Sequence, residues 1–421
     1  MSVAGRVPPA GFPVRLADAL AAFGTGRGDR DEAELAAAIE RRVGAGRVVL
    51  FSSGRAALVV LLRILRERAA AERTTLLVPA FGCPSLLAAA FVAGVRVRCV
   101  DVEPGTLRLD PRDLAREEGG DVLALLGVHL LGQPERMAEL ALWAGAHGAA
   151  LIDDAAQGLG GASGGGALGS AGDAGLLSFG RGKPLALLGG GALVARGEIS
   201  RAAERAAASL PRGDSALSVG ASTAGYALFR RPRLFAAAVR LPGLEVGVTR
   251  YDPEIAVARI GGARARLGLR LLPRLDAARG ARRLRWEAIA NALAERGAGA
   301  LTAIDRGAEP AYLRFPFVAP TAAARDGIIA SLRRAGIGAA RFYPEPLSLL
   351  AQRNGLASGR ARPMPGAEAL AERLVTIPVH EGLPIRAIDE IADRVSACLT
   401  GAAGETARRP AESASRAGAR R

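Results

Sequence analysis

The sequence LLSFGRGKPLALLGGGALVA, residues Leu176–Ala195, places one lysine between two apolar runs and among glycines. Lys183 is the single lysine of the chain, and all the others of its 56 Lys and Arg residues are arginines. A guanidinium cannot lose its proton to become a neutral, nucleophilic amine. A lysine kept in so arginine-rich a chain is therefore a candidate for amine chemistry. A chance lysine in a surface loop is the alternative, and composition alone does not decide between the two.

Length and composition indicate a soluble globular protein. The chain has 421 residues, enough for two to three domains, of which 50% are hydrophobic and 23% charged. Its cysteines, Cys83, Cys99 and Cys398, are too few and too scattered for a disulfide framework or a zinc knuckle, and its three histidines lie far apart, so we predict no metal site. The N-terminus does not resemble a signal peptide, and apolar runs such as Leu185–Val194 are too short to span a bilayer. We therefore expect a cytoplasmic protein without membrane insertion.

The formal net charge of +15 raises the question of nucleic-acid binding. The arginines, however, are spread along the chain rather than gathered in one stripe, and aromatic residues make up only 4% of the sequence. Part of the excess lies in the tail Gly401–Arg421 and part in Arg264–Arg285, where it is typical of the solvated face of long helices. We expect no nucleic-acid partner, because a basic surface suits an anionic small substrate equally well.

Short apolar runs alternate with helical stretches from residue 47 onward. Strands are predicted at Arg47–Ser53, Thr74–Ala80, Val95–Val102, Asp121–Leu130 and Ala150–Asp154, and helices at Gly54–Ala70, Pro84–Ala93, Leu109–Glu117 and Pro134–His147. Runs that are apolar on both faces, each followed by a helix, indicate a buried, mainly parallel sheet. Ligands bind beyond the carboxyl ends of such strands. Gly54, Asp154 and Lys183 all lie at or near these ends.

The remaining pattern predicts four segments. Residues 1–46 form an N-terminal arm and a helix, and residues 47–265 form a large domain. Residues 266–400 form a smaller C-terminal α/β domain, with strands at Tyr312–Pro320 and Leu374–Val379 and a final helix at Ile385–Leu399. Residues 401–421 are small and polar with scattered arginines, so we expect a disordered basic tail.

Four short motifs converge on one chemistry. They are SSGRAAL (Ser52–Leu58), IDDAAQ (Ile152–Gln157), SFGRGK (Ser178–Lys183) and GGG (Gly189–Gly191). The first is a strand-to-helix turn whose free N–H groups can hold an anion. A phosphate cup, a buried carboxylate and a lone lysine are together what pyridoxal phosphate requires, because the carboxylate keeps the pyridine nitrogen protonated. Each motif alone has an ordinary explanation, such as a helix cap, a satisfied hydroxyl or a plain turn.

At these residues the chain resembles the DegT/StrS family of fold-type I, pyridoxal-phosphate-dependent sugar aminotransferases. The resemblance runs from about Leu35 to Leu399. Its further motifs are VPAFGCPSLLAAAFVAGVRVRCVDVEPGTLRLDP, GVHLLGQPERM, LIDDAAQGLGG, GSAGDAGLLSFGRGK, RFYPEPL and ERLVTIPVHEGLP. It implies an α/β fold whose large domain has a mainly parallel sheet, with a smaller C-terminal α/β domain, in a homodimer.

The resemblance also implies residue roles. Lys183 would join the cofactor covalently and move a proton, and Asp154 would pair with the pyridinium. Gln157 would bind the phenolic oxygen of the ring, and a structural role is favoured for His129. Tyr343 either reaches the substrate or fills the core. The cofactor-binding set would be Lys183, Asp154, Gln157, Ser178, Gly54, Arg55 and Cys83.

Three departures from the family pattern place the chain in a divergent branch. Cys83 stands where an aromatic residue commonly stacks on the ring, and Arg55 stands where threonine commonly follows the cup glycine. The stretch that usually supplies an asparagine from the partner subunit is replaced by Tyr226–Ile255. Some relatives carry histidine in place of the lysine and are dehydratases, and Lys183 argues against that activity.

The resemblance therefore predicts an enzyme that transfers an amino group, from glutamate, to a nucleotide-linked keto sugar. The product would enter polysaccharide or glycosylated-metabolite synthesis. Two alternatives stay open: a pyridoxal phosphate enzyme acting on a non-sugar ketone, and a cofactor-binding regulatory protein without turnover.

Overall fold

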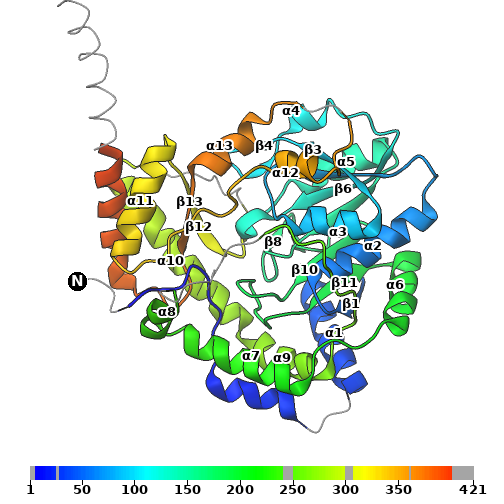
Figure 1. The fold of residues 1–421 in the computed structure, drawn as a ribbon, viewed down its shortest axis with the longest axis horizontal. Coiled ribbons are helices and arrows are strands. Elements are labelled where there is room, and N and C mark those ends of the chain that lie inside the picture. The colour runs from blue at the N-terminus through cyan, green and yellow to red at the C-terminus, as the bar shows by residue number, and fades with distance from the viewer. Residues whose placement is uncertain (1–4, 25–27, 240–249, 299–306, 360–361, 401–421) are drawn as a thin grey trace, which may run out of the picture.

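A seven-stranded sheet forms the centre of the larger part of the molecule (Figure 1). The computed structural model describes residues 5–24, 28–239, 250–298, 307–359 and 362–400. The strands are β1 (Arg47–Phe51), β2 (Thr75–Pro79), β3 (Arg96–Val100), β6 (Val122–Val128), β7 (Ala150–Asp154), β10 (Ala174–Ser178) and β11 (Gly191–Ala195), in the order β1-β11-β10-β7-β6-β2-β3. β11 runs antiparallel to both of its neighbours, and the other pairs are parallel. The prediction of a mainly parallel sheet is confirmed.

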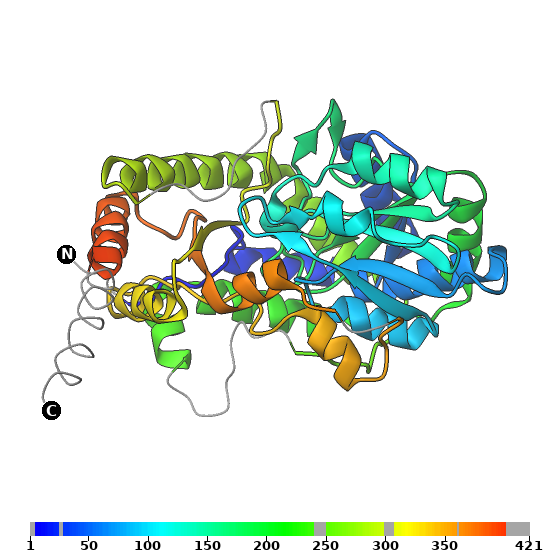
Figure 2. The same cartoon turned by 90° about the horizontal axis from the view of Figure 1, so that it is seen from above.

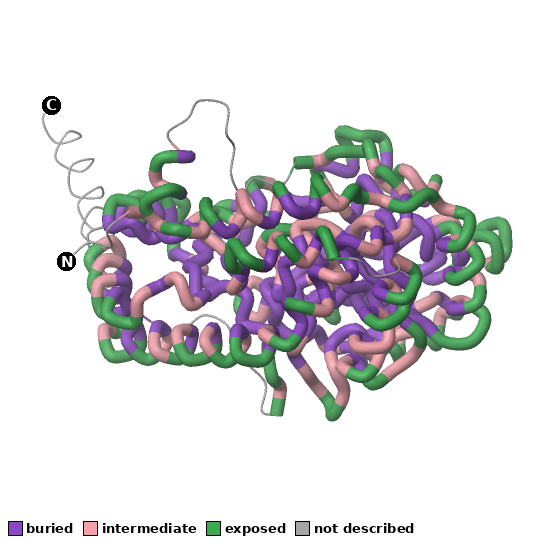
Figure 3. Tube along the Cα trace, turned by 90° about the horizontal axis from the view of Figure 1, so that it is seen from below, coloured by how far each residue is buried: buried purple, intermediate pink, exposed green. Residues whose placement is uncertain are grey.

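Helices cover both faces of this sheet because its strands are apolar on both sides. Along β1, Val49 and Phe51 join one hydrophobic cluster, and Val48 and Leu50 join another, as the alternation of side chains in a strand requires. The first cluster includes residues of α2 (Gly54–Arg68), α3 (Ser85–Ala93) and α6 (Gly197–Ser209). The second includes residues of α1 (Gly28–Val43) and α9 (Gly262–Leu271). Figure 3 shows the buried residues concentrated in the interior and the exposed ones along the outline of the molecule.

One predicted helix is present but shorter than expected. The segment Leu109–Glu117 begins as a strand, because β4 (Val102–Glu103) pairs with β5 (Arg108–Leu109) in a small hairpin. The helix that follows is only α4 (Pro111–Leu114). Asp110 sets the end of β5 and the start of α4. Its N–H donates to the Asp101 carbonyl, and its side chain accepts from the N–H of Arg112 at 2.9 Å. The same hairpin shortens the strand predicted at Val95–Val102 to β3.

A smaller α/β layer lies beside the large sheet. Its strands β12 (Arg314–Val318) and β13 (Leu374–Pro378) are antiparallel. Its helices are α10 (Leu275–Glu295), α11 (Ala322–Arg334) and residues 388–400. The long helix α10 links the two layers (Figure 2), because Leu275 belongs to a cluster of the large sheet whereas Ile289 and Leu293 belong to the cluster around β12 and β13. The second α/β layer was expected, and the domain limits at residues 265 and 266 stay a prediction.

The described residues form further helices and strands. They are η1 (Leu16–Phe23), η2 (Leu130–Gly132), α5 (Met137–Ala146), β8 (Ala162–Ser163), β9 (Gly166–Ala167), α7 (Ala216–Phe229), α8 (Pro232–Ala238), η3 (Leu272–Arg274), α12 (Leu347–Arg353), α13 (Pro365–Arg373) and η4 (Ile385–Ala387). None of the described helices is long and apolar enough to cross a membrane. The predicted disordered tail, residues 401–421, lies outside the described residues.

Candidate active site

Lys183 lies in the loop that joins β10 to β11, at the carboxyl end of β10, and it is half-buried. The loop is closed at its base, because the N–H of Phe179 donates to the Gly190 carbonyl at 2.9 Å. From α10, Arg282 donates to the Pro184 carbonyl at 3.0 Å and so fixes the residue that follows the lysine. The structure therefore confirms the prediction that Lys183 lies beyond the end of a strand.

Asp154 ends β7, and its carboxyl group is buried near Lys183. Burial raises the pKa of Asp154, whereas the N–H of Ala156, which donates to it at 2.8 Å, and the charge of Lys183 act in the opposite direction. A buried carboxylate with so few partners is costly, and a neighbouring cation would stabilise its charged form. A protonated pyridine nitrogen is a cation of this kind.

Asp153 precedes Asp154, but its carboxylate is hydrogen-bonded to other groups of the protein. Its Oδ1 lies 2.6 Å from His129 Nε2, and its Oδ2 accepts from the N–H groups of Gly169 at 3.0 Å and Ala171 at 2.9 Å. Because successive side chains of a strand point to opposite faces, the two carboxylates cannot share one function. Of the two acids in the IDD motif, Asp154 is therefore the one available to a cofactor.

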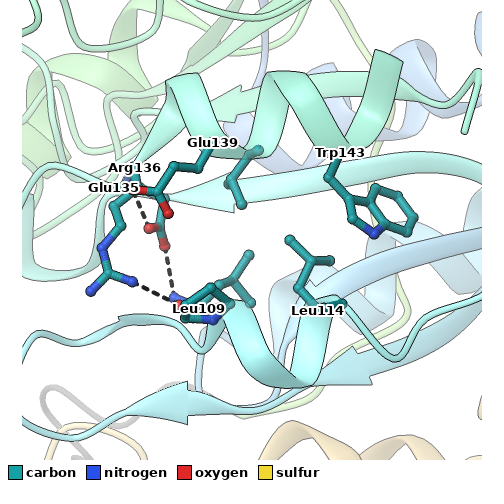
Figure 4. Close-up of a pocket in the computed structure, with 9 residues that line it drawn as sticks. Leu109, Leu114, Glu135, Arg136, Glu139 and Trp143 are labelled. Carbon is teal, nitrogen blue, oxygen red and sulfur yellow. Dashed lines mark hydrogen bonds between the residues drawn. The ribbon is translucent and has the colours of Figure 1, made fainter. Parts of the chain in front are cut away.

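His129 is held by bonds on both ring nitrogens. The N–H of Glu135 donates to its Nδ1 at 2.8 Å, so Nε2 carries the proton and donates to Asp153. The Glu135 carboxylate accepts from the N–H of Leu109 at 3.0 Å, at the edge of a cavity of about 150 Å³ that also touches Trp143 (Figure 4). The structural role favoured for His129 accounts for all of these contacts.

A cradle forms where α2 begins. Ser53 caps this helix and accepts from the N–H of Ala56 at 3.0 Å, while Gly54 packs against Ser178 at the end of β10. A Cβ on Gly54 would lie 2.9 Å from the Ser178 Cβ, and one on Gly191 would lie 2.2 Å from the Gly54 nitrogen. Both glycines are therefore required by close approach. The free N–H groups of the helix start and the Ser178 hydroxyl gather at one point, as a phosphate group needs.

Arg55 has a different neighbour. Its Nη1 lies 3.4 Å from Asp252 Oδ2, and its side chain is 36% exposed. The structure thus places the Arg55 backbone at the cradle, while its guanidinium contacts the segment that follows residue 249.

Gln157 and Cys83 both lie close to Tyr343. Gln157 Oε1 accepts from the N–H of Leu131 at 3.1 Å, and its Nε2 donates to the Tyr343 hydroxyl at 3.4 Å. Burial raises the pKa of Tyr343 well above its usual range, and the nearby Cys83 acts in the same direction. Phe81 packs edge-on against the Tyr343 ring with the centroids 5.6 Å apart. Tyr343, for which the sequence left two roles open, therefore lies with the candidate site residues.

Sequence reasoning missed Arg314. It begins β12, is 8% exposed, and donates from Nη1 to Thr376 Oγ1 at 3.0 Å, with its guanidinium carbon 5.2 Å from the centre of the Phe342 ring. Burial lowers the pKa of Arg314 to about 10. The available signal was a charged residue in the otherwise apolar stretch RFPFV, and the abundance of arginine concealed it.

These residues fit pyridoxal phosphate. The cradle at Gly54 and Ser178 has room for no side chain. Asp154 is a buried acid that makes no ion pair within the described residues, and the charge of Lys183 acts on it from nearby. Within the described residues, no group of three or more His, Cys, Asp or Glu side chains could hold a metal ion.

Comparison with known proteins gives a consistent result. A model of the DegT/DnrJ/EryC1/StrS aminotransferase family matches residues 17–396. Protein MosB of Rhizobium meliloti is 34% identical over 163 residues, which are 38% of this chain, and the match spans about a third (32%) of MosB.

Solved structures agree over nearly the whole chain. Helicobacter pylori PseC, an aminotransferase involved in the biosynthesis of pseudoaminic acid, superposes with a TM-score of 0.71 and 16% identity, covering 95% of this chain and 100% of PseC. DesI, solved in the presence of its TDP-sugar product, superposes with a TM-score of 0.72 and 21% identity, covering 96% of each chain. At these identities the superpositions establish the fold, which is that of fold-type I, pyridoxal-phosphate-dependent aminotransferases.

Proposed function

The chain belongs to the DegT/DnrJ/EryC1/StrS aminotransferase family, and from this premise we propose that it transfers an amino group from glutamate to a nucleotide-linked keto sugar. Pyridoxal phosphate is the expected cofactor of this aminotransferase. The observation that carries the proposal is the half-buried Lys183 beside the buried Asp154, next to the cradle of Gly54 and Ser178. The product would enter polysaccharide or glycosylated-metabolite synthesis, and the protein would act in the cytoplasm.

Each residue of the site has a chemical task. When bound, pyridoxal phosphate supplies an electron sink for the charge that develops at the reacting carbon. Asp154 would hold the positive charge of the ring nitrogen, and Gln157 would orient the ring from the side of Tyr343. The N–H groups at Gly54 and the Ser178 hydroxyl would bind the phosphate. Lys183 would take a proton from the amino donor and return it to the acceptor, which requires an amine that can lose its charge.

A nucleotide-linked sugar is favoured over other ketones by two observations. DesI has the same fold and was solved with a TDP-sugar product, and the net charge of +15 suits an anionic substrate. A non-sugar ketone stays the alternative. A regulatory protein without turnover is disfavoured because the sole lysine lies beside Asp154.

The proposal is tested by trapping and by turnover. We expect borohydride to fix a pyridoxyl group on Lys183, found by peptide mapping, and Lys183→Arg to be as inactive as Lys183→Ala, since charge is kept but the nucleophile is lost. Mass spectrometry of products from a panel of nucleotide keto sugars with glutamate then identifies the acceptor. A purified protein with no adduct at Lys183 would overturn the enzyme assignment, and aminated non-sugar ketones would overturn the substrate class.

We also propose a homodimer with the active site near the subunit boundary, as in the family that the chain resembles. Sedimentation should show two chains per particle. Removal of residues 401–421 should change neither that mass nor the activity, because this stretch lacks core-forming residues. An active monomer would contradict the dimer.

A further inference from the structure

We propose that Arg314 binds a carboxylate group of the amino donor, an inference that rests on the proposed transamination. Arg314 is 8% exposed, and its one hydrogen bond to the described part of the chain is from Nη1 to the neutral Thr376 hydroxyl. Among the described residues, no carboxylate lies within ion-pair distance of its guanidinium. A buried cation without a counter-ion is costly in a folded protein. An anion from outside the chain would remove that cost.

Other buried arginines of the structure are compensated from within. Arg264 pairs with Asp214 at 2.6 Å, and Arg325 pairs with Asp326 at 2.6 Å. Arg282 donates to two backbone carbonyls and lies in the field of Glu381, which raises its pKa against the effect of burial. For Arg314 the group that opposes burial is the Tyr343 hydroxyl, which is itself neutral because burial raises its pKa. Arg314 therefore has no anionic partner among the described residues.

The backbone places Arg314 at the candidate site. The N–H of Leu313 donates to the Leu131 carbonyl at 3.1 Å, and the N–H of Leu131 donates to Gln157 Oε1 at 3.1 Å. Gln157 in turn donates to the Tyr343 hydroxyl at 3.4 Å. The Arg314 guanidinium covers the Phe342 ring, which adjoins Tyr343 in the sequence and packs against its ring at 4.3 Å. Arg314 thus approaches the cofactor residues from the smaller layer.

The unused edge of the guanidinium defines the ligand. Nη1 is engaged by Thr376, whereas Nε and Nη2 make no hydrogen bond to any described residue. Two parallel N–H groups match the two oxygens of one carboxylate. The same fork can bind a phosphate oxygen of a nucleotide, which is the second source of such an anion. The low exposure of Arg314 favours the small, planar carboxylate.

Binding measurements distinguish the two sources without requiring turnover. Isothermal titration of the holoenzyme with glutarate, which has two carboxylates and no amine to transfer, should give a Kd that rises about 10- to 100-fold in Arg314→Gln. Arg314→Lys should lose less, because a charge remains without the fork. The Kd for UDP and for dTDP should be unchanged in both variants. Arg325→Gln, which removes a buried but paired arginine of the same layer, should leave all of these values unchanged.

The inference has clear contrary results. Equal glutarate affinity in the parent and in a folded Arg314→Gln protein, or no glutarate binding by the parent, would overturn it. Loss of UDP or dTDP affinity with glutarate affinity intact would assign Arg314 to the nucleotide instead. In turnover, Arg314→Lys should raise the KM for glutamate far more than it lowers kcat. Borohydride labelling of Lys183 should persist in every Arg314 variant, so a failure of the proposed function is recognised separately.

Discussion

At the residue scale, two adjacent acids have different environments. Asp153 accepts from His129 and from two backbone N–H groups, so its charge is satisfied by the protein itself. Asp154 has one such donor, Ala156, and its pKa is raised by burial. The alternation of a β-strand separates the two side chains, although they are consecutive in the sequence.

Asp154→Ala should keep bound cofactor but slow the half-reaction with glutamate by about 100-fold or more, since a preorganised charge partner is lost. Stopped-flow absorbance of the cofactor measures this rate. Asp153→Asn is the matched variant. It should lower the thermal unfolding temperature, while the rate of the half-reaction falls far less than in Asp154→Ala. A parental rate in Asp154→Ala would assign the ring nitrogen to another group.

At the scale of elements, the start of α2 supplies most of the anion-binding capacity. Its first N–H groups lack partners within the helix, and the helix dipole adds partial positive charge there. Gly54 and Gly191 allow β10, β11 and α2 to meet at one point, as their close approach shows. Arg55 stands at the same helix start, although its guanidinium now contacts Asp252 at 3.4 Å.

We predict that Arg55 compensates for phosphate ligands that the family usually has and this chain lacks. Arg55→Ala should weaken retention of pyridoxal phosphate about 10- to 100-fold, because a charge-assisted contact is lost. Arg55→Thr should recover part of it through its hydroxyl. Asp252→Asn, which removes the present partner of Arg55, should not weaken retention. Exhaustive dialysis followed by absorbance measures the bound cofactor, and full retention by Arg55→Ala would show that the Arg55 guanidinium takes no part in phosphate binding.

At the scale of the whole molecule, the N-terminal arm ties the two layers together. Val7 lies in the cluster around β12 and β13, while Phe12 lies in a cluster of the large sheet. His380 Nε2 lies 2.9 Å from the Pro8 carbonyl and donates to it, because Nδ1 accepts from the N–H of Gly382 at 3.1 Å. The folded protein therefore holds this histidine neutral, and burial lowers the pKa of His380 to about 4.

Stability should consequently fall as the pH drops from about 6.5 to about 4, because the unfolded chain binds a proton there that folded His380 excludes. The loss attributable to this group is up to about 3 kcal/mol. His380→Gln should lose less unfolding free energy than the parent between pH 7 and pH 5, measured by urea denaturation. His147→Gln, which changes a half-buried histidine, should follow the parent. Parallel curves for the parent and His380→Gln would contradict this assignment.

The sequence by itself determined the fold class and singled out the amine that we propose as catalytic. Hydrophobic runs that are apolar on both faces can be buried only in a covered sheet, so the strands β1, β2, β3, β6 and β7 followed from local pattern. Lys183 was distinguished by composition, since no arginine can perform its chemistry. The hairpin that precedes the short helix α4 did not follow, because its end depends on the contact between Asp110 and the more distant Asp101.

Only the tertiary structure decided which residues surround the lysine. The sequence alone did not distinguish Asp153 from Asp154. Their different hydrogen-bond partners in the folded structure did. Arg55 was predicted from its place in the helix, but its guanidinium contacts Asp252, 197 positions away. Arg314 was hidden among the arginines until the packing of β12 against η2 placed it near Tyr343, with no counter-ion in the described part of the chain. Charge compensation depends on distances between segments remote in the chain, and local sequence does not encode these distances.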